Sequence, residues 1–140
     1  MTGVQTCALP IWNTSFSKIC LGMRRHGEGN VNFILINYVA NSLYSLIADG
    51  EYRNTSVGRD TWKTLFGSQV RLQPNCNKEG FNAYCVRSTW IAVRIGILGN
   101  NEDDCNSCDS RMGFGGAGRP NDSYTCGNAK EAVMGYIMVQ

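Results

Sequence analysis

Hydrophobic and polar residues alternate along several stretches of this chain, and such alternation is typical of strands with one buried face. The clearest stretch is residues 90–98, WIAVRIGIL, which ends in front of Gly99. One side of this stretch, taken as an extended chain, carries branched apolar residues: Ile91, Val93, Ile95 and Ile97. Arg94 and small residues occupy the other side. The pattern predicts a half-buried strand over residues 90–98.

Two further strands are predicted between residues 17 and 39. The glycine-rich sequence HGEGN, at residues 26–30, separates two apolar runs and predicts a turn or longer loop between them. In the second run Phe33 and Leu35 alternate with Ile34 and Ile36. We therefore expect a pair of strands joined through this loop.

The middle of the chain has a weaker pattern. Asp49-Gly50 predicts a turn after residues 43–47, which suit a strand or a short helix. Large apolar side chains follow, and we expect Trp62, Leu65 and Phe66 to anchor the core. The next alternation, at Val70 and Leu72, predicts a strand, which Pro74, Asn75 and Gly80 interrupt.

The last ten residues, EAVMGYIMVQ, form an almost wholly apolar run. We predict a central strand that lies beside the strand at 90–98, with an unbroken helix as the competing prediction. Taken together, the patterns predict an α+β, mostly β fold. We expect a twisted antiparallel sheet with long Gly- and Asp-rich loops and few short helices.

Composition narrows the class of protein. The chain has 140 residues, of which 43% are hydrophobic and 17% charged, which suits a single globular domain. The net charge of +2 comes from scattered Lys and Arg, so we expect no nucleic-acid partner, and we expect no membrane span. Seven cysteines are typical of a secreted chain of this length, and they predict an oxidising, extracellular location.

The first eleven residues, MTGVQTCALPI, resemble a peptide translated from sequencing-adapter DNA. A genuine apolar N-terminus is the alternative, whereas a signal peptide is disfavoured because a basic segment and a long apolar run are missing before Asn13. We therefore expect residues 1–11 to be non-native and residues 12–140 to be the C-terminal part of one domain. Three N-glycosylation sequons begin at Asn13, Asn54 and Asn121, and we expect glycans at Asn54 and Asn121.

Oxygen donors are concentrated between residues 100 and 109. Calcium binds carboxylate, amide and backbone carbonyl oxygens, and this segment supplies all three. The side chains expected to bind it are Glu102, Asp103, Asp104, Asn106 and Asp109. Their spacing is not that of an EF-hand, so a solvated acidic turn is an equal alternative from the residues alone.

The closely spaced Cys105 and Cys108 raise three possibilities. A structural zinc site needs a second cysteine pair or a histidine pair, and a thioredoxin-like motif needs a helix start, so both are disfavoured. Disulfide formation is the remaining prediction. The cysteines expected to take part are Cys20, Cys76, Cys105, Cys108 and Cys126, and their pairing is open.

No set of residues with the pattern of a catalytic site emerges. The single histidine, His26, lies beside Arg24 and Arg25 and is expected at the surface, so a triad with a histidine base is disfavoured. Paired acids such as Asp103 and Asp104 leave a hydrolase as a distant alternative. We expect a protein that is not an enzyme.

The segments KICLGM, SLYSLIADGEYRNTSVGRDTWK, GSQVRLQPNCNKEGFN, VRIGILGNNEDDCNSCDSRMGFG, SYTCGN and MGYIMVQ carry a family resemblance. Over residues 17–140 the chain resembles a group of secreted invertebrate proteins, some of them skeletal organic matrix proteins, that are similar to fibrinogen-C-like and intelectin-like domains. The resemblance implies a partial fibrinogen-C-like domain whose acidic loop binds calcium next to a pocket for a glycan or an acetylated ligand.

The resemblance also implies roles for particular residues. It places Phe114, Gly115 and Asn128 at the ligand pocket, and it makes Cys20 with Cys105 the preferred disulfide. The intelectin site uses a histidine and a glutamate on calcium, and this loop has neither at the matching place, which makes glycan binding less secure than metal binding. The chain is also shorter than the group between Asn128 and Ala132.

The sequence therefore predicts a non-catalytic, calcium-dependent, lectin-like recognition module outside the cell, with homo-oligomers possible. The alternative is a structural protein of the extracellular matrix or of a biomineral, without a specific glycan site. A titration with calcium and the effect of a chelator on glycan binding separate the two.

Overall fold

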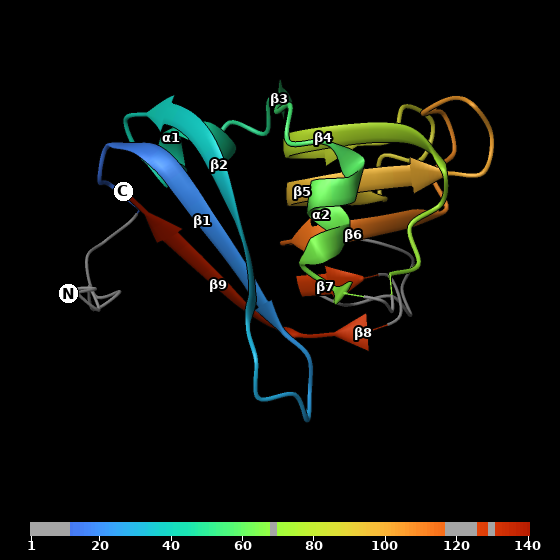
Figure 1. Cartoon of the computed structure of the whole chain (residues 1–140). Coiled ribbons are helices and arrows are strands. Elements are labelled where there is room, and N and C mark those ends of the chain that lie inside the picture. The colour runs from blue at the N-terminus through green and yellow to red at the C-terminus, as the bar shows by residue number, and fades with distance from the viewer. Residues whose placement is uncertain (1–11, 68–69, 117–125, 129–130) are drawn as a thin grey trace.

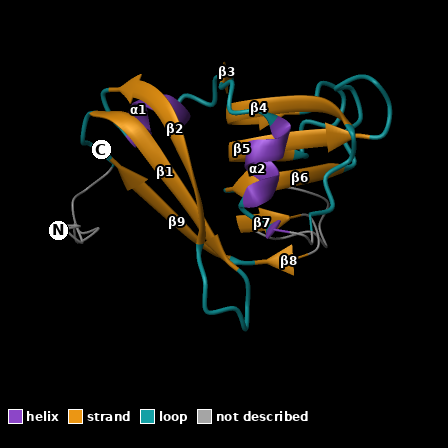
Figure 2. Cartoon of the chain, viewed as in Figure 1, coloured by secondary structure: helices purple, strands orange, loops and turns teal. Residues whose placement is uncertain are grey.

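The computed structural model describes residues 12–67, 70–116, 126–128 and 131–140. These residues form an α+β, mostly β fold with two antiparallel sheets and two short helices (Figure 1, Figure 2). The prediction of the fold class is confirmed. We expected one sheet, however, whereas the strands divide between a sheet of three strands and a sheet of six.

The three-stranded sheet has the order β2-β1-β9. Its strands are β1 (Phe16–Arg24), β2 (Asn32–Ala40) and β9 (Met134–Val139). The loop around HGEGN joins β1 to β2, so the predicted pair of strands is confirmed. Ile34 and Ile36 of β2 are buried while Phe33 and Leu35 are half exposed. The alternation of the sequence therefore separates an inner face of this sheet from an outer face.

The six-stranded sheet has the order β3-β4-β5-β6-β7-β8. Its strands are β3 (Arg53–Asn54), β4 (Asn75–Tyr84), β5 (Ala92–Asn100), β6 (Ser110–Phe114), β7 (Cys126–Asn128) and β8 (Glu131–Ala132). β5 is the strand expected at 90–98, shifted by two residues, and its buried residues include Val93, Ile95 and Ile97. Tight pairing of β5 with β6 requires the facing glycines Gly96 and Gly113, since a Cβ on either would meet backbone atoms of the other strand at 2.2 Å.

Two short helices lie between the strands in the sequence. Helix α1 (Leu43–Ile47) begins at Ser42, whose side chain accepts a hydrogen bond from the Ser45 amide while the Ser45 hydroxyl accepts one from Ser42. This reciprocal capping selects the helix over the strand that residues 43–47 also suited. Helix α2 (Arg59–Thr64) begins after Gly58 and crosses in front of β4, β5 and β6 in Figure 1.

The main hydrophobic core draws residues from both sheets and both helices. Trp62, Leu65 and Phe66 are at most 1% exposed, which confirms their prediction as core anchors. Tyr38 of β2 packs edge-on against Phe81 of β4, with 4.9 Å between ring centroids, and so bridges the two sheets. A smaller buried cluster consists of Ala83, Cys85, Val93, Leu98 and Cys108.

Three predicted elements are wrong. The last ten residues do not form one central strand beside residues 90–98, because β8 ends the six-stranded sheet and β9 is an edge strand paired with β1. Val70 and Leu72 pack against the core outside any strand. The residues expected to interrupt a strand after Pro74 instead form β4, which tolerates Gly80 and a register shift between Cys76 and Glu79.

Candidate functional site

Two disulfides attach the acidic loop, residues 101–109, to the six-stranded sheet. Cys105 is bonded to Cys76 of β4 with a Cα–Cα distance of 4.8 Å, and Cys108 is bonded to Cys85 with a Cα–Cα distance of 5.9 Å. The backbone amide of Val86 also donates to the carbonyl of Cys105 at 3.0 Å. The loop is therefore fixed at both of its cysteines against the segment in and after β4.

These pairings confirm that Cys76, Cys105 and Cys108 form disulfides. The expected disulfide between Cys20 and Cys105 is wrong. Cys20 lies on β1 in the three-stranded sheet, opposite Leu35, whereas Cys105 is taken by Cys76 in the other sheet. Cys20 is free among the described residues, and burial raises the pKa of its thiol. Sequence reasoning did not single out Cys85. The backbone of Cys126 lies in β7, but its side chain is outside the described part of the chain.

The acidic side chains expected to bind calcium are not gathered into one group among the described residues. Glu102, Asp103, Asp104 and Asp109 are exposed and Asn106 is half-buried. Asp104 accepts hydrogen bonds from the Asn106 amide at 2.6 Å and from Asn100 at 3.2 Å. Among the described residues no group of three or more His, Cys, Asp or Glu side chains is placed to hold a metal ion. The acidic side chains as they stand do not form a calcium cage, and calcium binding stays a prediction.

One atom beside this loop lacks a partner. The Asn100 side chain is fully buried, its Nδ2 donates to the carbonyl and the carboxylate of Asp104, and its Oδ1 accepts no hydrogen bond. A buried acceptor without a donor is costly, and a bound cation is one of the groups that satisfies it. Asn100 Oδ1 is thus the buried side-chain atom beside this loop that lacks a hydrogen-bond partner among the described residues.

The three residues expected at a ligand pocket have different environments. Phe114 is 6% exposed and belongs to the main core, so its ring packs inside the protein. Asn128 lies in β7, and its side chain is outside the described part. Gly115 lines a pocket, with a backbone φ of 60° that favours glycine. Among the described surroundings of these residues, Gly115 is the one that lines a cavity.

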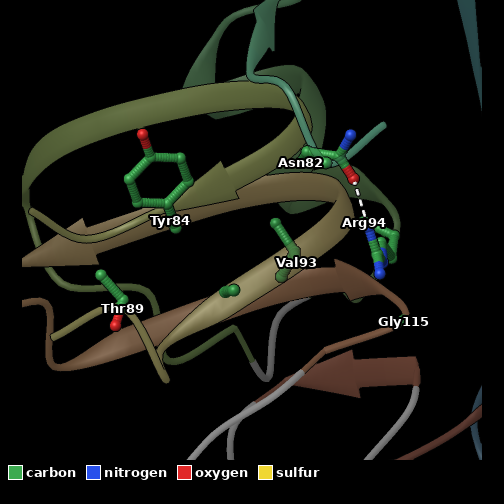
Figure 3. Close-up of a pocket in the computed structure, with 8 residues that line it drawn as sticks. Asn82, Tyr84, Thr89, Val93, Arg94 and Gly115 are labelled. Atoms are coloured by element: carbon green, nitrogen blue, oxygen red, sulfur yellow. Dashed lines mark hydrogen bonds between the residues drawn. The ribbon is translucent and has the colours of Figure 1, made fainter. Parts of the chain in front are cut away.

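This cavity, which we call the Arg94 pocket, has a volume of about 380 Å³. It lies across the ends of β4 and β5 (Figure 3). Its lining residues are Gly50, Asn82, Tyr84, Thr89, Ala92, Val93, Arg94 and Gly115. The volume falls in the range of pockets that hold small molecules, and the lining combines an apolar floor with a few polar groups.

Arg94 is held in one position at this pocket. Its Nη1 donates to Asn82 Oδ1 at 2.9 Å and to the carbonyl of Ile47, the last residue of α1, at 3.1 Å. Figure 3 shows the first of these bonds. The aliphatic stem packs on Gly115, where an added Cβ would come within 2.6 Å of Arg94 Cγ. Gly115 therefore has a steric role, because any side chain there would displace the arginine.

Asn82 organises the other side of the pocket. It is buried and has a backbone φ of 49°, a left-handed conformation that Asn tolerates better than most residues. Its Nδ2 donates to the carbonyls of Ile47 and Glu51 at 3.2 and 3.1 Å, which joins the end of α1 to β4. The Asn82 oxygen is thereby left facing Arg94.

Sequence reasoning missed four residues of this pocket: Asn82, Tyr84, Thr89 and Arg94. A charged residue in the middle of the apolar run at 90–98 was a usable signal, because such runs on central strands seldom contain an arginine. The partner itself, Asn82, lies twelve residues away on the neighbouring strand and carries no local mark.

The remaining predicted positions lie at the surface or outside the described part. Asn54 is exposed on the edge strand β3, and Asn121 is outside the described residues. His26 is exposed in the loop between β1 and β2. Within the described ranges no helix is long and apolar enough to cross a membrane.

Comparisons of the chain with protein-family models, with curated proteins and with solved structures find no match. The resemblance to fibrinogen-like and intelectin-like domains therefore stays a prediction, and the candidate site depends on its geometry.

Proposed function

We propose that this protein is a non-catalytic extracellular recognition module that binds a glycan or an acetylated ligand in the Arg94 pocket. The observation that carries the proposal is the fixed arginine. Asn82 and the end of α1 hold its guanidinium in place before any ligand arrives, and Gly115 lies against its aliphatic stem. A binding group that is already positioned loses less entropy when the ligand binds.

The disulfides support the extracellular part of the proposal. Cys76–Cys105 and Cys85–Cys108 connect the segment around β4 to the loop between β5 and β6. Such bonds persist in oxidising compartments and are rare in reducing ones. The exposed sequon at Asn54 agrees with passage through a secretory pathway.

We further propose that recognition depends on calcium bound at residues 100–109. The supporting features are the concentration of oxygen donors and the unpartnered Oδ1 of Asn100. A calcium ion there would draw on Asn100 and Asp104 and would order the loop.

A glycan array with the oxidised protein tests the proposal, in buffer with calcium and in buffer with a chelator. We expect binding to defined glycans that Arg94→Gln removes and that the chelator weakens. The double variant Asp103→Asn/Asp104→Asn should behave as the chelator does. The control is Glu51→Gln/Asp60→Asn, which removes two exposed acids outside the loop. Absence of binding to every glycan and acetylated compound would contradict recognition, whereas binding that ignores the chelator would contradict only the calcium part.

A structural matrix role is the second candidate, and one observation favours it. The four carboxylates of the loop are exposed, and no three of them are grouped to hold one metal ion, which suits contact with many ions of a mineral surface. Sedimentation with calcium carbonate crystals tests this role. Retention on the crystals that the Asp103/Asp104 variant loses and the Arg94 variant keeps would favour the matrix role.

A further inference from the structure

The charge of the Arg94 pocket selects among ligands. Arg94 is the single charged residue among those that line it, and no Asp or Glu is among them. Asp49 and Glu51 flank the lining Gly50 without lining the pocket, and Asp49 is engaged by Arg53 at 2.6 Å. One positively charged residue therefore stands in the lining of the cavity without an anionic partner among the other lining residues.

Two nitrogens of the Arg94 guanidinium remain available as hydrogen-bond donors. Nη1 is occupied by Asn82 and Ile47, whereas Nη2 and Nε make no hydrogen bond with any residue that the structure describes. Those two nitrogens share the edge of the guanidinium that binds a carboxylate or sulfate with two parallel bonds. Arg94 is exposed, and neither nitrogen of this edge is occupied by a described residue.

The rest of the lining suits a sugar. Tyr84 is 40% exposed, and neither its hydroxyl nor that of Thr89 is bonded to a described residue. Figure 3 shows both side chains across the pocket from Arg94. An aromatic ring with free hydroxyls nearby can stack on the apolar face of a sugar and hydrogen-bond its hydroxyls. Lys78 lies 4.4 Å from the centre of the Tyr84 ring and adds positive potential on that side.

We infer that the Arg94 pocket binds a sugar with a singly charged anionic substituent, a carboxylate or a sulfate ester, on the free edge of Arg94. This inference rests on the proposed function and narrows its ligand.

Calorimetric titration of the oxidised protein with four probes tests the inference: glucuronic acid, its neutral methyl ester, glucose and glucose 6-sulfate. We expect the acid or the sulfate to bind at least roughly tenfold more tightly than the ester and glucose, and this preference should weaken as salt is added. The sulfate and the acid together identify which anion is preferred.

The possible outcomes distinguish the preference for an anionic sugar from the proposed function as a glycan-binding module. Equal affinity for glucuronic acid, its ester and glucose would overturn the anion preference and leave a glycan-binding module. Failure of these four probes together with every glycan of the array would overturn both.

Substitutions of Arg94 test whether the charged probe binds in this pocket. Arg94→Gln should weaken binding of the charged probe at least roughly tenfold, and Arg94→Lys less so, since lysine keeps the charge but lacks the planar edge. Arg71→Gln is the matched control, because Arg71 is exposed and does not line the pocket. If Arg94→Gln fails to fold, the contrast between acid and ester on the unaltered protein still decides the question.

Discussion

The carboxylate of Glu79 organises the start of helix α2. Its Oε2 accepts hydrogen bonds from the hydroxyl of Thr55, the amide of Val57 and the indole of Trp62, at 2.6 to 2.9 Å. Its Oε1 accepts one from the amide of Gly58 at 2.8 Å. A half-buried side chain on β4 therefore fixes the two residues before helix α2 and the indole of Trp62 within it.

We predict that Glu79→Ala lowers the free energy of unfolding by about 2–4 kcal/mol, because several donors lose their acceptor at once. Urea denaturation followed by tryptophan fluorescence measures the loss. Glu51→Gln serves as the control, since Glu51 is exposed and its carboxylate has no donor among the described residues. Equal stability of the Glu79 variant and the unaltered protein would contradict the role of this side chain.

The ion pair of Asp49 with Arg53 predicts a pH dependence. The Arg53 guanidinium and the backbone amide of Glu51 lower the pKa of Asp49 from its usual 3.8 to about 2. A lowered folded-state pKa means that the pair contributes stability above about pH 4 and loses it as the pH falls towards about 2. The pair is exposed, so its contribution is small and sensitive to salt.

Thermal unfolding of Asp49→Asn across this range measures the effect. We expect the variant to melt below the unaltered protein at neutral pH and to converge with it near pH 2. A constant difference between the two at every pH would show that the carboxylate charge plays no part.

At the scale of the elements, the structure predicts which cysteines are bonded to each other, which the sequence left open. Peptide mapping of the oxidised protein by mass spectrometry should find Cys76 bonded to Cys105 and Cys85 bonded to Cys108. A Cys20–Cys105 peptide would contradict the arrangement of the two sheets, since these residues lie in different sheets.

The Cys85–Cys108 bond also stabilises the fold. It closes a separation of 23 residues, and both cysteines are buried in the smaller cluster. The double substitution Cys85→Ala/Cys108→Ala should cost about 2–4 kcal/mol by the loop-entropy estimate. The single variant Cys20→Ser is the control, since it leaves both bonds in place, and denaturant titration compares the two.

At the scale of the whole molecule, both sheets face one core, and the three-stranded sheet has an outer face in water. Ile36 is 3% exposed on the inner face, whereas its neighbour Leu35 is 54% exposed on the outer one. We expect Ile36→Ala to cost about 2–4 kcal/mol, through lost burial and the cavity it leaves. Leu35→Ala should stay within about 0.5 kcal/mol of the unaltered protein.

Denaturant unfolding of the two variants side by side checks this assignment. The two substitutions remove side chains of the same size at adjacent positions. A difference in stability between them therefore reports which face of the sheet each side chain occupies. A greater loss for Leu35→Ala than for Ile36→Ala would reverse the inner and outer faces of the sheet.

Local signals determined a definite part of this protein. Alternation of side chains predicted β2 and β5, because a strand with one buried face repeats every two residues. The apolar run before the HGEGN loop predicted β1. Size and hydrophobicity marked Trp62, Leu65 and Phe66 for the core. The number and spacing of cysteines predicted disulfides.

Only the tertiary structure decided which strands, cysteines and pocket residues lie next to each other. β4 escaped prediction because Cys76, Asn77 and Asn82 adopt left-handed backbone conformations that neighbouring strands and a disulfide hold in place. β9 pairs with β1 across more than a hundred residues, and the Arg94 pocket joins the turn after α1, β4, β5 and the turn after β6. Strand order, cysteine pairing and pocket shape depend on contacts between residues distant in the chain, and no local periodicity records such contacts.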